Sequence, residues 1–277
     1  MKIKTCLFSA LAITFIFAGI AFFPARQAHA DLMIYPIYAY FGDRDRIFDI
    51  ALLNTADTPA TFKLNLENLK QTEAGGYIAH EGPLNPAFDP EKIVVYSPRQ
   101  VNLPAHGKQR IRVSLRRPES LPPGEYRAHL KMERIDASKP LPQAQPGKIV
   151  TNIKINISYS VPIIVRQGES DAQAKIGTMK LIAAELKKPA FIELDVGRTG
   201  HYSTIGNLKV FWTASGKEEE QIGTLNNFNI FPESGRRLAR IPLTNPNISN
   251  GTVRIIYEGV GPDEKKVFDE KIFPVGG

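Results

Sequence analysis

The sequence predicts an all-β protein that consists of two β-sandwich domains. Apolar and polar residues alternate in short stretches, which is the period of a half-buried strand. Turn residues separate these stretches, since the chain of 277 residues contains 21 glycines and 21 prolines. Helical periodicity is almost absent. The length suits two domains of ordinary size.

Residues 1–30 are predicted to be a secretory signal peptide. Two lysines precede an apolar run at 7–23, and the small residues Ala28 and Ala30 occupy the two positions that a signal peptidase reads. Cleavage after Ala30 leaves Asp31 as the first residue of the mature chain. The apolar run is also long enough for an uncleaved membrane anchor, which is the alternative interpretation.

The only cysteine, Cys6, lies in this leader. The mature chain can therefore enter an oxidising compartment without disulfides, and its cores alone must stabilise it. The formal net charge of +7 is spread along the sequence without a long block of basic residues. Nucleic acid is therefore not an expected partner.

No catalytic or metal-binding motif is recognisable. The histidines of the mature chain lie far apart in sequence, at His80, His106, His129 and His201. No thiol accompanies them, which disfavours a zinc site or a cysteine nucleophile. A phosphate-binding loop, a G-x-S-x-G elbow and an H-E-x-x-H pair are missing. We expect no enzyme activity, no metal, no cofactor and no small-molecule substrate.

The first predicted domain covers residues 31–166 and is interpreted as a seven-stranded antiparallel sandwich. Alternation at 48–52 and again at 62–66, on either side of a Thr-Ala-Asp-Thr-Pro turn, predicts a hairpin. Further strands are predicted near 94–96, 101–103, 111–115 and 126–132.

The last stretch of this domain, 153–165, is predicted to be an unusually long strand. Its alternating row holds seven apolar residues, Ile153, Ile155, Ile157, Tyr159, Val161, Ile163 and Val165. Pro162 has no N–H for a ladder, which indicates a sheet edge where an apolar row can capture another chain. The proline-rich segment 136–148 is expected to be a mobile connector. The alternative is a long strand that belongs wholly to the core.

Residues 167–174 are polar and predict a linker, and residues 175–277 predict a second, smaller β-sandwich. Glycines punctuate its predicted strands at 191–196, 208–212, 221–225, 238–243, 253–257 and 267–273. Residues 179–188 are expected to be a strand or an irregular entry rather than a helical turn.

Parts of the sequence resemble the periplasmic pilus and fimbrial assembly chaperones of the PapD type. The similar segments are 31–54, VYSPRQVNLPAHGKQRIR at 95–112, LPPGEYRAHL at 121–130, and 153–166. The resemblance implies two immunoglobulin-like sandwich domains in a boomerang arrangement. It also implies a periplasmic chaperone that acts in fimbrium biogenesis and cell wall organization. Such a chaperone fills the gap in a subunit that lacks one strand, which is donor-strand complementation, and passes the subunit to an outer-membrane usher.

The resemblance also assigns residues. The subunit-binding row falls on the outer half of the long strand, at Ile153, Ile155, Ile157 and Tyr159. An interdomain ion pair falls on Glu125 and Arg166. Its usual acidic third member is not evident from the sequence. The neighbouring acids Asp263 and Glu264 are interpreted as solvated turn residues.

One expected feature of the family is missing. The two basic residues that bind the subunit's terminal carboxylate fall here on Tyr38 and Pro162. Either another cation, such as Arg99 or Lys154, takes over this role, or the subunit docks differently.

The competing interpretation is a secreted or surface β-sandwich, such as an adhesin, that binds carbohydrate or host ligands itself. Trp212 alternates with Val210, which favours a place in the core over a sugar-binding platform. Residues 201–204 are interpreted as a loop between strands rather than a polar site. An adhesin has no need of the long edge strand, which favours the chaperone.

Overall fold

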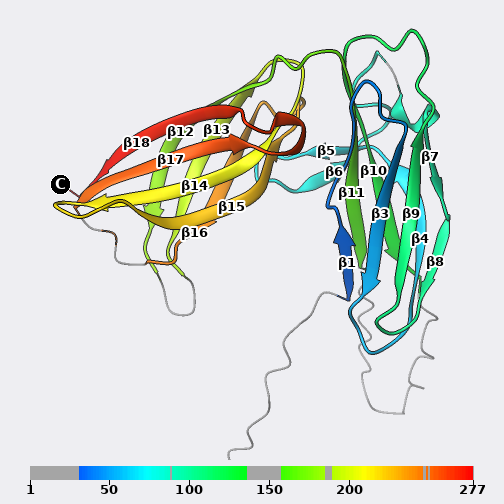
Figure 1. The fold of residues 1–277 in the computed structure, drawn as a ribbon, viewed down its shortest axis with the longest axis horizontal. Helices are drawn as coiled ribbons and strands as arrows, with labels where there is room; N and C mark the ends of the chain where they lie inside the picture. The colour runs from blue at the N-terminus through cyan, green and yellow to red at the C-terminus, as the bar shows by residue number, and fades with distance from the viewer. Residues whose placement is uncertain are drawn as a thin grey trace, which may run out of the picture.

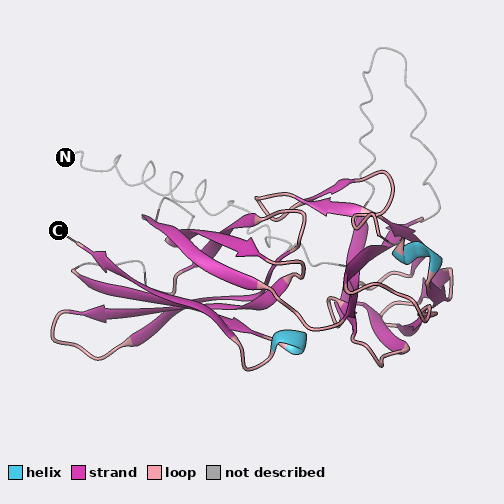
Figure 2. Cartoon of the chain, turned by 90° about the horizontal axis from the view of Figure 1, so that it is seen from above, coloured by secondary structure: helices cyan, strands magenta, loops and turns pink. Residues whose placement is uncertain are grey.

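The computed structural model describes residues 31–276 except 88, 136–156, 185–188, 246–247 and 249. The predicted signal peptide and the predicted connector therefore lie outside the described residues. The described chain is almost entirely strand, and its helical parts are two short 3-10 helices, η2 (Pro90–Lys92) and η3 (Gly261–Asp263) (Figure 2). No helix in the described ranges is long and apolar enough to cross a membrane. The all-β prediction is confirmed.

The first sandwich consists of a four-stranded and a five-stranded sheet. The four-stranded sheet has the order β1 (Leu32–Tyr35), β3 (Ile47–Asn54), β9 (Lys108–Leu115) and β7 (Val94–Ser97). The five-stranded sheet has the order β2 (Ala39–Phe41), β11 (Ser158–Gln167), β10 (Gly124–Arg134), β4 (Ala60–Glu67) and β8 (Gln100–Leu103). Alternate residues of both sheets, such as Ile50, Phe62 and Ile163, form one buried core.

The predicted hairpin between 48–52 and 62–66 is wrong, because β3 and β4 lie in opposite sheets. Alternation shows which face of a strand is buried, but it does not show which strand lies beside it. The fully buried Asn54 stabilises the crossing between the sheets. Its Nδ2 atom donates to the carbonyl oxygens of Thr58 at 2.8 Å and Pro104 at 2.9 Å.

The prediction of seven antiparallel strands is also wrong in detail. The N-terminal stretch forms two strands, of which β1 pairs with β3 and β2 pairs with β11 in the other sheet. The β2–β11 pair is parallel and joins Ile163 to Ala39 and Val165 to Phe41.

A tyrosine at the start of β10 supports the immunoglobulin-like character of this sandwich. Tyr126 is fully buried, and its hydroxyl donates to the carbonyl oxygen of Pro122 at 2.8 Å. A tyrosine that bonds back to the chain a few residues upstream is typical of immunoglobulin-like domains.

The second sandwich consists of a three-stranded and a four-stranded sheet. The first has the order β12 (Gln173–Ile182), β13 (Phe191–Thr199) and β16 (Arg236–Pro242). The second has the order β15 (Glu220–Ile230), β14 (Thr204–Ala214), β17 (Gly251–Gly259) and β18 (Val267–Val275). Its core is separate from the first, and Trp212 packs against it.

The two sandwiches lie at a steep angle to each other, as the boomerang arrangement implies (Figure 1). The chain passes from one to the other between β11 and β12. A small buried cluster of Ile164, Ile205 and Phe231 lies where they meet. A hairpin of β5 (Leu69–Gln71) and β6 (Tyr77–Ala79) projects from the first sandwich toward the second.

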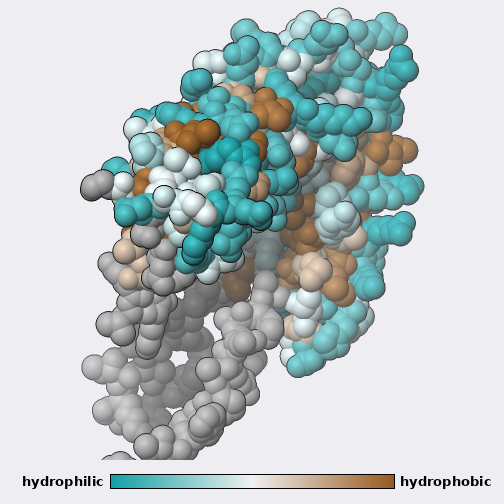
Figure 3. Space-filling view, turned by 60° about the vertical axis from the view of Figure 1, so that its left-hand side comes forward, coloured by the Kyte–Doolittle hydropathy of each residue, from teal (hydrophilic) through white to brown (hydrophobic). Residues whose placement is uncertain are grey.

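The molecular face that Figure 3 shows is mostly hydrophilic, with several smaller hydrophobic areas. Large apolar side chains that are at least half exposed include Met33, Tyr35 and Ile47 in the first sandwich and Ile272 in the second. Tyr35 and Ile47 line one pocket, together with Ile37, which is half exposed.

Candidate functional site

The long strand β11 is paired on one side along its whole length but only partly on the other. It pairs with β10 from Ser158 to Gln167, whereas β2 covers only Ile163, Ile164 and Val165. In the described part of the chain, no strand lies along the outer edge of β11 from Ser158 to Pro162. Unpaired backbone groups of this kind can accept a strand from another chain.

Burial decreases along β11 toward its N-terminal end. Val161, Ile163 and Val165 are at most 2% exposed and belong to the core. Tyr159 is partly buried against the same core. Ile157, the residue before β11, is 43% exposed. The alternating row therefore leaves the core at Ile157, the first described residue after the range 136–156.

The predicted subunit-binding residues thus divide into two groups. Ile153 and Ile155 lie outside the described residues. Tyr159 lies on β11 with its ring 6.2 Å from that of Phe62, and Ile157 lies beside it at the exposed end.

Tyr38 and Pro162, the two positions that correspond to the basic residues, each directly precede a residue of the first β2–β11 pair, Ala39 and Ile163. Pro162 is buried opposite His129 of β10. Tyr38 packs against the small cluster between the sandwiches. The guanidinium of Arg99 lies 3.9 Å from the ring centroid of Tyr96, in the first sandwich. Lys154 lies outside the described residues.

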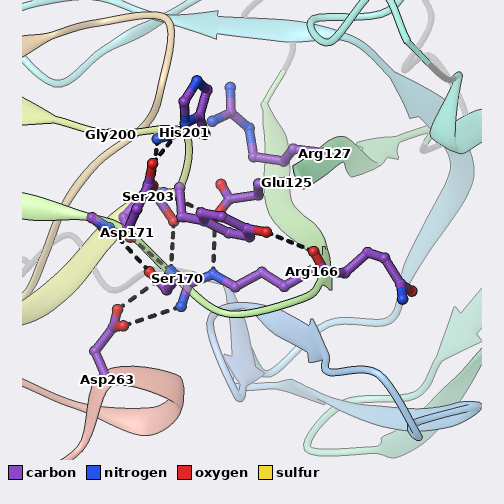
Figure 4. A network of polar contacts seen from close by, with 12 residues as sticks. Glu125, Arg127, Arg166, Ser170, Asp171, Gly200, His201, Ser203 and Asp263 are labelled. Atoms are coloured by element: carbon purple, nitrogen blue, oxygen red, sulfur yellow. Dashed lines mark hydrogen bonds and ion pairs between the residues drawn. The ribbon is translucent and has the colours of Figure 1, made fainter. Parts of the chain in front are cut away.

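Arg166 lies at the centre of a buried polar network between the sandwiches (Figure 4). Its Nε atom donates to Glu125 Oε2 at 3.0 Å, and the two residues are direct neighbours across β10 and β11. From the second sandwich, Asp263 accepts from Nη1 at 3.1 Å and from Nη2 at 3.3 Å. The side chains of all three residues are at most 4% exposed.

Ser203 completes this network from the second sandwich. Its carbonyl oxygen accepts from Arg166 Nη2 at 2.7 Å, and its backbone N–H donates to Glu125 Oε2 at 2.9 Å. Its hydroxyl donates to the same carboxylate oxygen at 2.7 Å. Burial disfavours the charge of Arg166, but the carboxylates of Glu125 and Asp263 outweigh it and hold the pKa of Arg166 above its usual value.

The interpretation of Asp263 as a solvated turn residue is wrong. Asp263 is 6% exposed and ends η3, in the connection between β17 and β18. Its partner Arg166 is 97 residues away in the sequence, so local pattern gave no sign of the contact. The Gly-Pro-Asp turn was the only signal, because Pro262 and the positive φ of Gly261 fix the backbone there.

Residues 200–203 form a loop between β13 and β14, so the loop ends one residue before the predicted one, and Tyr202 and Ser203 make contacts across the junction. The Tyr202 hydroxyl donates to the carbonyl oxygen of Gln167 at 2.6 Å, and Ser203 belongs to the Arg166 network. Thr204 Oγ1 accepts from the Tyr257 hydroxyl at 3.1 Å. Among the described residues, no cluster of His, Cys, Asp and Glu has the geometry of a metal site.

Comparisons of the sequence found no matching family model and no matching curated protein. Comparison of the structure found solved chaperones. The class 5 fimbriae chaperone CfaA shares 17% identity at a TM-score of 0.41, with 88% of this chain and 98% of that chain covered. The Pseudomonas aeruginosa CupB2 chaperone shares 12% identity at a TM-score of 0.41, with 88% and 100% covered.

The E. coli chaperone DraB shares 14% identity at a TM-score of 0.40, with 87% of this chain and 95% of that chain covered. The chain is thus similar to solved chaperones, of which CfaA is a fimbriae chaperone.

Proposed function

We propose that the protein is a periplasmic chaperone that binds pilus or fimbrial subunits by donor-strand complementation. The observation that carries the proposal is the outer edge of β11, which has no strand partner from Ser158 to Pro162 in the described chain. The apolar row of the same strand leaves the core at Ile157. An open backbone edge beside an exposed apolar row is what strand addition requires.

In this proposal the backbone of β11 pairs with the subunit, while Ile153, Ile155, Ile157 and Tyr159 enter the gap in the subunit's core. Fully burying an isoleucine contributes roughly 1.5–3 kcal/mol before the ordering costs of association are subtracted. The buried residues from Val161 to Val165 anchor the strand in the chaperone. The protein acts by binding, without catalysis and without a cofactor.

The sequence supports the periplasm as the site of action. The predicted signal peptide directs export, and the absence of cysteine after Cys6 suits an oxidising compartment. Transfer of the bound subunit to an outer-membrane usher is the part of the proposal that rests on the sequence resemblance alone.

The test is co-purification from the periplasm. The tagged protein is expressed with the neighbouring genes of its own genome, and a small β-rich subunit is expected to elute with it in a one-to-one ratio. Ile157→Asp is expected to lose the subunit, because a charge then has to enter the subunit's core. Ile272→Asp is the matched control, since Ile272 is 61% exposed on β18 of the second sandwich.

Equal capture by the parent chain and the Ile157→Asp variant would contradict the proposed site. Binding of the free protein to carbohydrate without capture of any subunit would favour the adhesin-like interpretation instead.

A further inference from the structure

The β5–β6 hairpin belongs to neither sandwich. Its two strands form a separate two-stranded sheet, with Leu69 opposite Ala79 and Gln71 opposite Tyr77. All residues of the hairpin, 69–79, are described, and none belongs to either hydrophobic core. In Figure 1 the hairpin reaches from the first sandwich to the second.

Gln71 attaches the hairpin to the second sandwich. It is 2% exposed, and its Nε2 atom donates to Asn229 Oδ1 at 2.7 Å. Its Oε1 atom accepts from the backbone N–H of Phe231 at 3.1 Å. Its own backbone donates to Glu233 Oε1 at 3.0 Å and accepts from the Ser234 hydroxyl at 3.0 Å. These contacts satisfy both ends of a buried amide, which is the condition for burying one at low cost.

The turn of the hairpin makes a second attachment. The carbonyl oxygen of Glu73 accepts from the backbone N–H of Leu238 in β16 at 2.8 Å. A Cβ atom at Gly75 would lie 2.3 Å from Nη2 of Arg237, so the absent side chain lets this arginine pack over the turn.

Aromatic rings join the hairpin, the first sandwich and the second sandwich. The ring centroid of Tyr77 lies 4.8 Å from that of His129 on β10 and 6.5 Å from that of Phe231. The guanidinium of Arg127, also on β10, lies 3.6 Å from the Phe231 ring centroid and pairs with Glu233. The hairpin therefore covers the part of β10 that carries Arg127 and His129.

We propose that the β5–β6 hairpin is an interdomain latch, which fixes the angle between the sandwiches and can undock while both sandwiches stay folded. The two cores contain none of its residues, so undocking leaves both intact. The chain between β11 and β12, the Arg166 network and the contacts of Arg127 with Glu233 and Phe231 join the sandwiches without the hairpin. The sandwiches can turn about this junction when the latch is released. Undocking uncovers Arg127 and His129.

The absence of cysteine outside the leader makes the angle measurable. In a Cys6→Ser background, Lys108→Cys and Lys217→Cys place one spin label on an exposed position of each sandwich. Double electron–electron resonance then reports the distance between them. The parent chain is expected to give one narrow distribution. Gln71→Ala and, separately, Tyr77→Ala are expected to shift and broaden it.

Lys70→Ala is the matched control, because Lys70 lies on the same hairpin and is exposed. It is expected to leave the distribution unchanged. The far-ultraviolet circular dichroism of each variant at the temperature of the measurement is expected to equal that of the parent. Unchanged distances in both Gln71→Ala and Tyr77→Ala would overturn the proposal. Loss of the strand signal in both would also overturn it, since the hairpin would then be part of the folded cores.

Discussion

Arg166 and Asp263 lie 97 residues apart in the sequence and form a two-point ion pair, at 3.1 and 3.3 Å, between the two sandwiches. Glu125 adds a second carboxylate from the first sandwich. One buried cation thus bonds a carboxylate from each sandwich. Each of the three charges has lost its contact with water and is stabilised by its partners instead. The network therefore holds the sandwiches together only while all three charges are present.

Removal of the cation is expected to weaken the fold strongly. Arg166→Met leaves Glu125 and Asp263 buried without a positive partner, and loss of one member of a buried pair costs about 3–5 kcal/mol. Urea unfolding measures the change. Arg112→Met is the control, because Arg112 pairs with Asp49 while its side chain is 63% exposed, so that water and salt screen the pair. Similar losses in both variants would contradict a special role of the buried network.

The coupling within the network is expected to be measurable by a double-mutant cycle. Glu125→Gln and Arg166→Met are compared with the double variant, and a coupling free energy above about 1 kcal/mol is expected for residues that share one buried network. A coupling of zero would show that the pair contributes no more than an exposed one.

The row along β11 is expected to change from a binding surface to core between Ile157 and Ile163. Ile163 is fully buried, so that Ile163→Asp should cost several kcal/mol of unfolding free energy. Ile157 is 43% exposed, and Ile157→Asp should leave the unfolding temperature almost unchanged. We expect the same of Ile155→Asp, together with loss of subunit capture. Equal destabilisation by Ile157→Asp and Ile163→Asp would show that the row is core throughout.

Acid is expected to weaken the packing around His129. Burial, and then the nearby charge of Arg127, lower the pKa of His129 from 6.5 to about 2. Other titratable groups near it are Tyr77 on β6, Glu67 opposite it on β4, and Glu233, which pairs with Arg127. Buried His129 cannot take up a proton in this range, whereas exposed His129 can. The free energy that favours the buried state is therefore fully present above pH 6.5 and falls by about 1.4 kcal/mol for each pH unit below 6.5.

The measurement is the distance distribution between the sandwiches, with the labels described above, at pH 7 and pH 5. The parent chain should broaden at pH 5. His129→Phe should not, because phenylalanine keeps a ring between Tyr77 and Phe231 and cannot be protonated. The same broadening in both chains would assign the pH effect to other groups.

The corner at Asn54 is expected to be a point of high sensitivity in the first sandwich. Asn54→Ala leaves the carbonyl oxygens of Thr58 and Pro104 without this donor in a buried place, at a cost of about 1–3 kcal/mol. Asn102→Ala, at an exposed position on β8, should change the free energy of unfolding by less than about 0.5 kcal/mol. Chemical denaturation of the two variants compares them directly.

Period-two alternation was sufficient to predict most of the longer strands, since each side chain of a strand faces either the core or the solvent, but it did not predict the short strands β5 and β6. Alternation was not sufficient to show which strands pair. A hairpin of β3 and β4 was wrongly predicted, because the same residues of β3 are buried whichever strand lies beside it. Contacts between distant segments left no local pattern. Neither the buried contact of Asp263 with Arg166 nor the attachment of Gln71 to the second sandwich follows from the local sequence. Glu125 and Arg166 could be assigned from the sequence because both lie in segments that carry the resemblance.

The short strand β2 has a consequence for any strand that adds to β11. β2 occupies the outer edge of β11 from Ile163 onward, so an added strand has to end before that residue. A slip of one residue would exchange the two faces of the added strand. The chain's own N-terminal segment thus limits how far a partner strand can slide along β11. This limit also determines which residues of the partner face Tyr159 and Ile157.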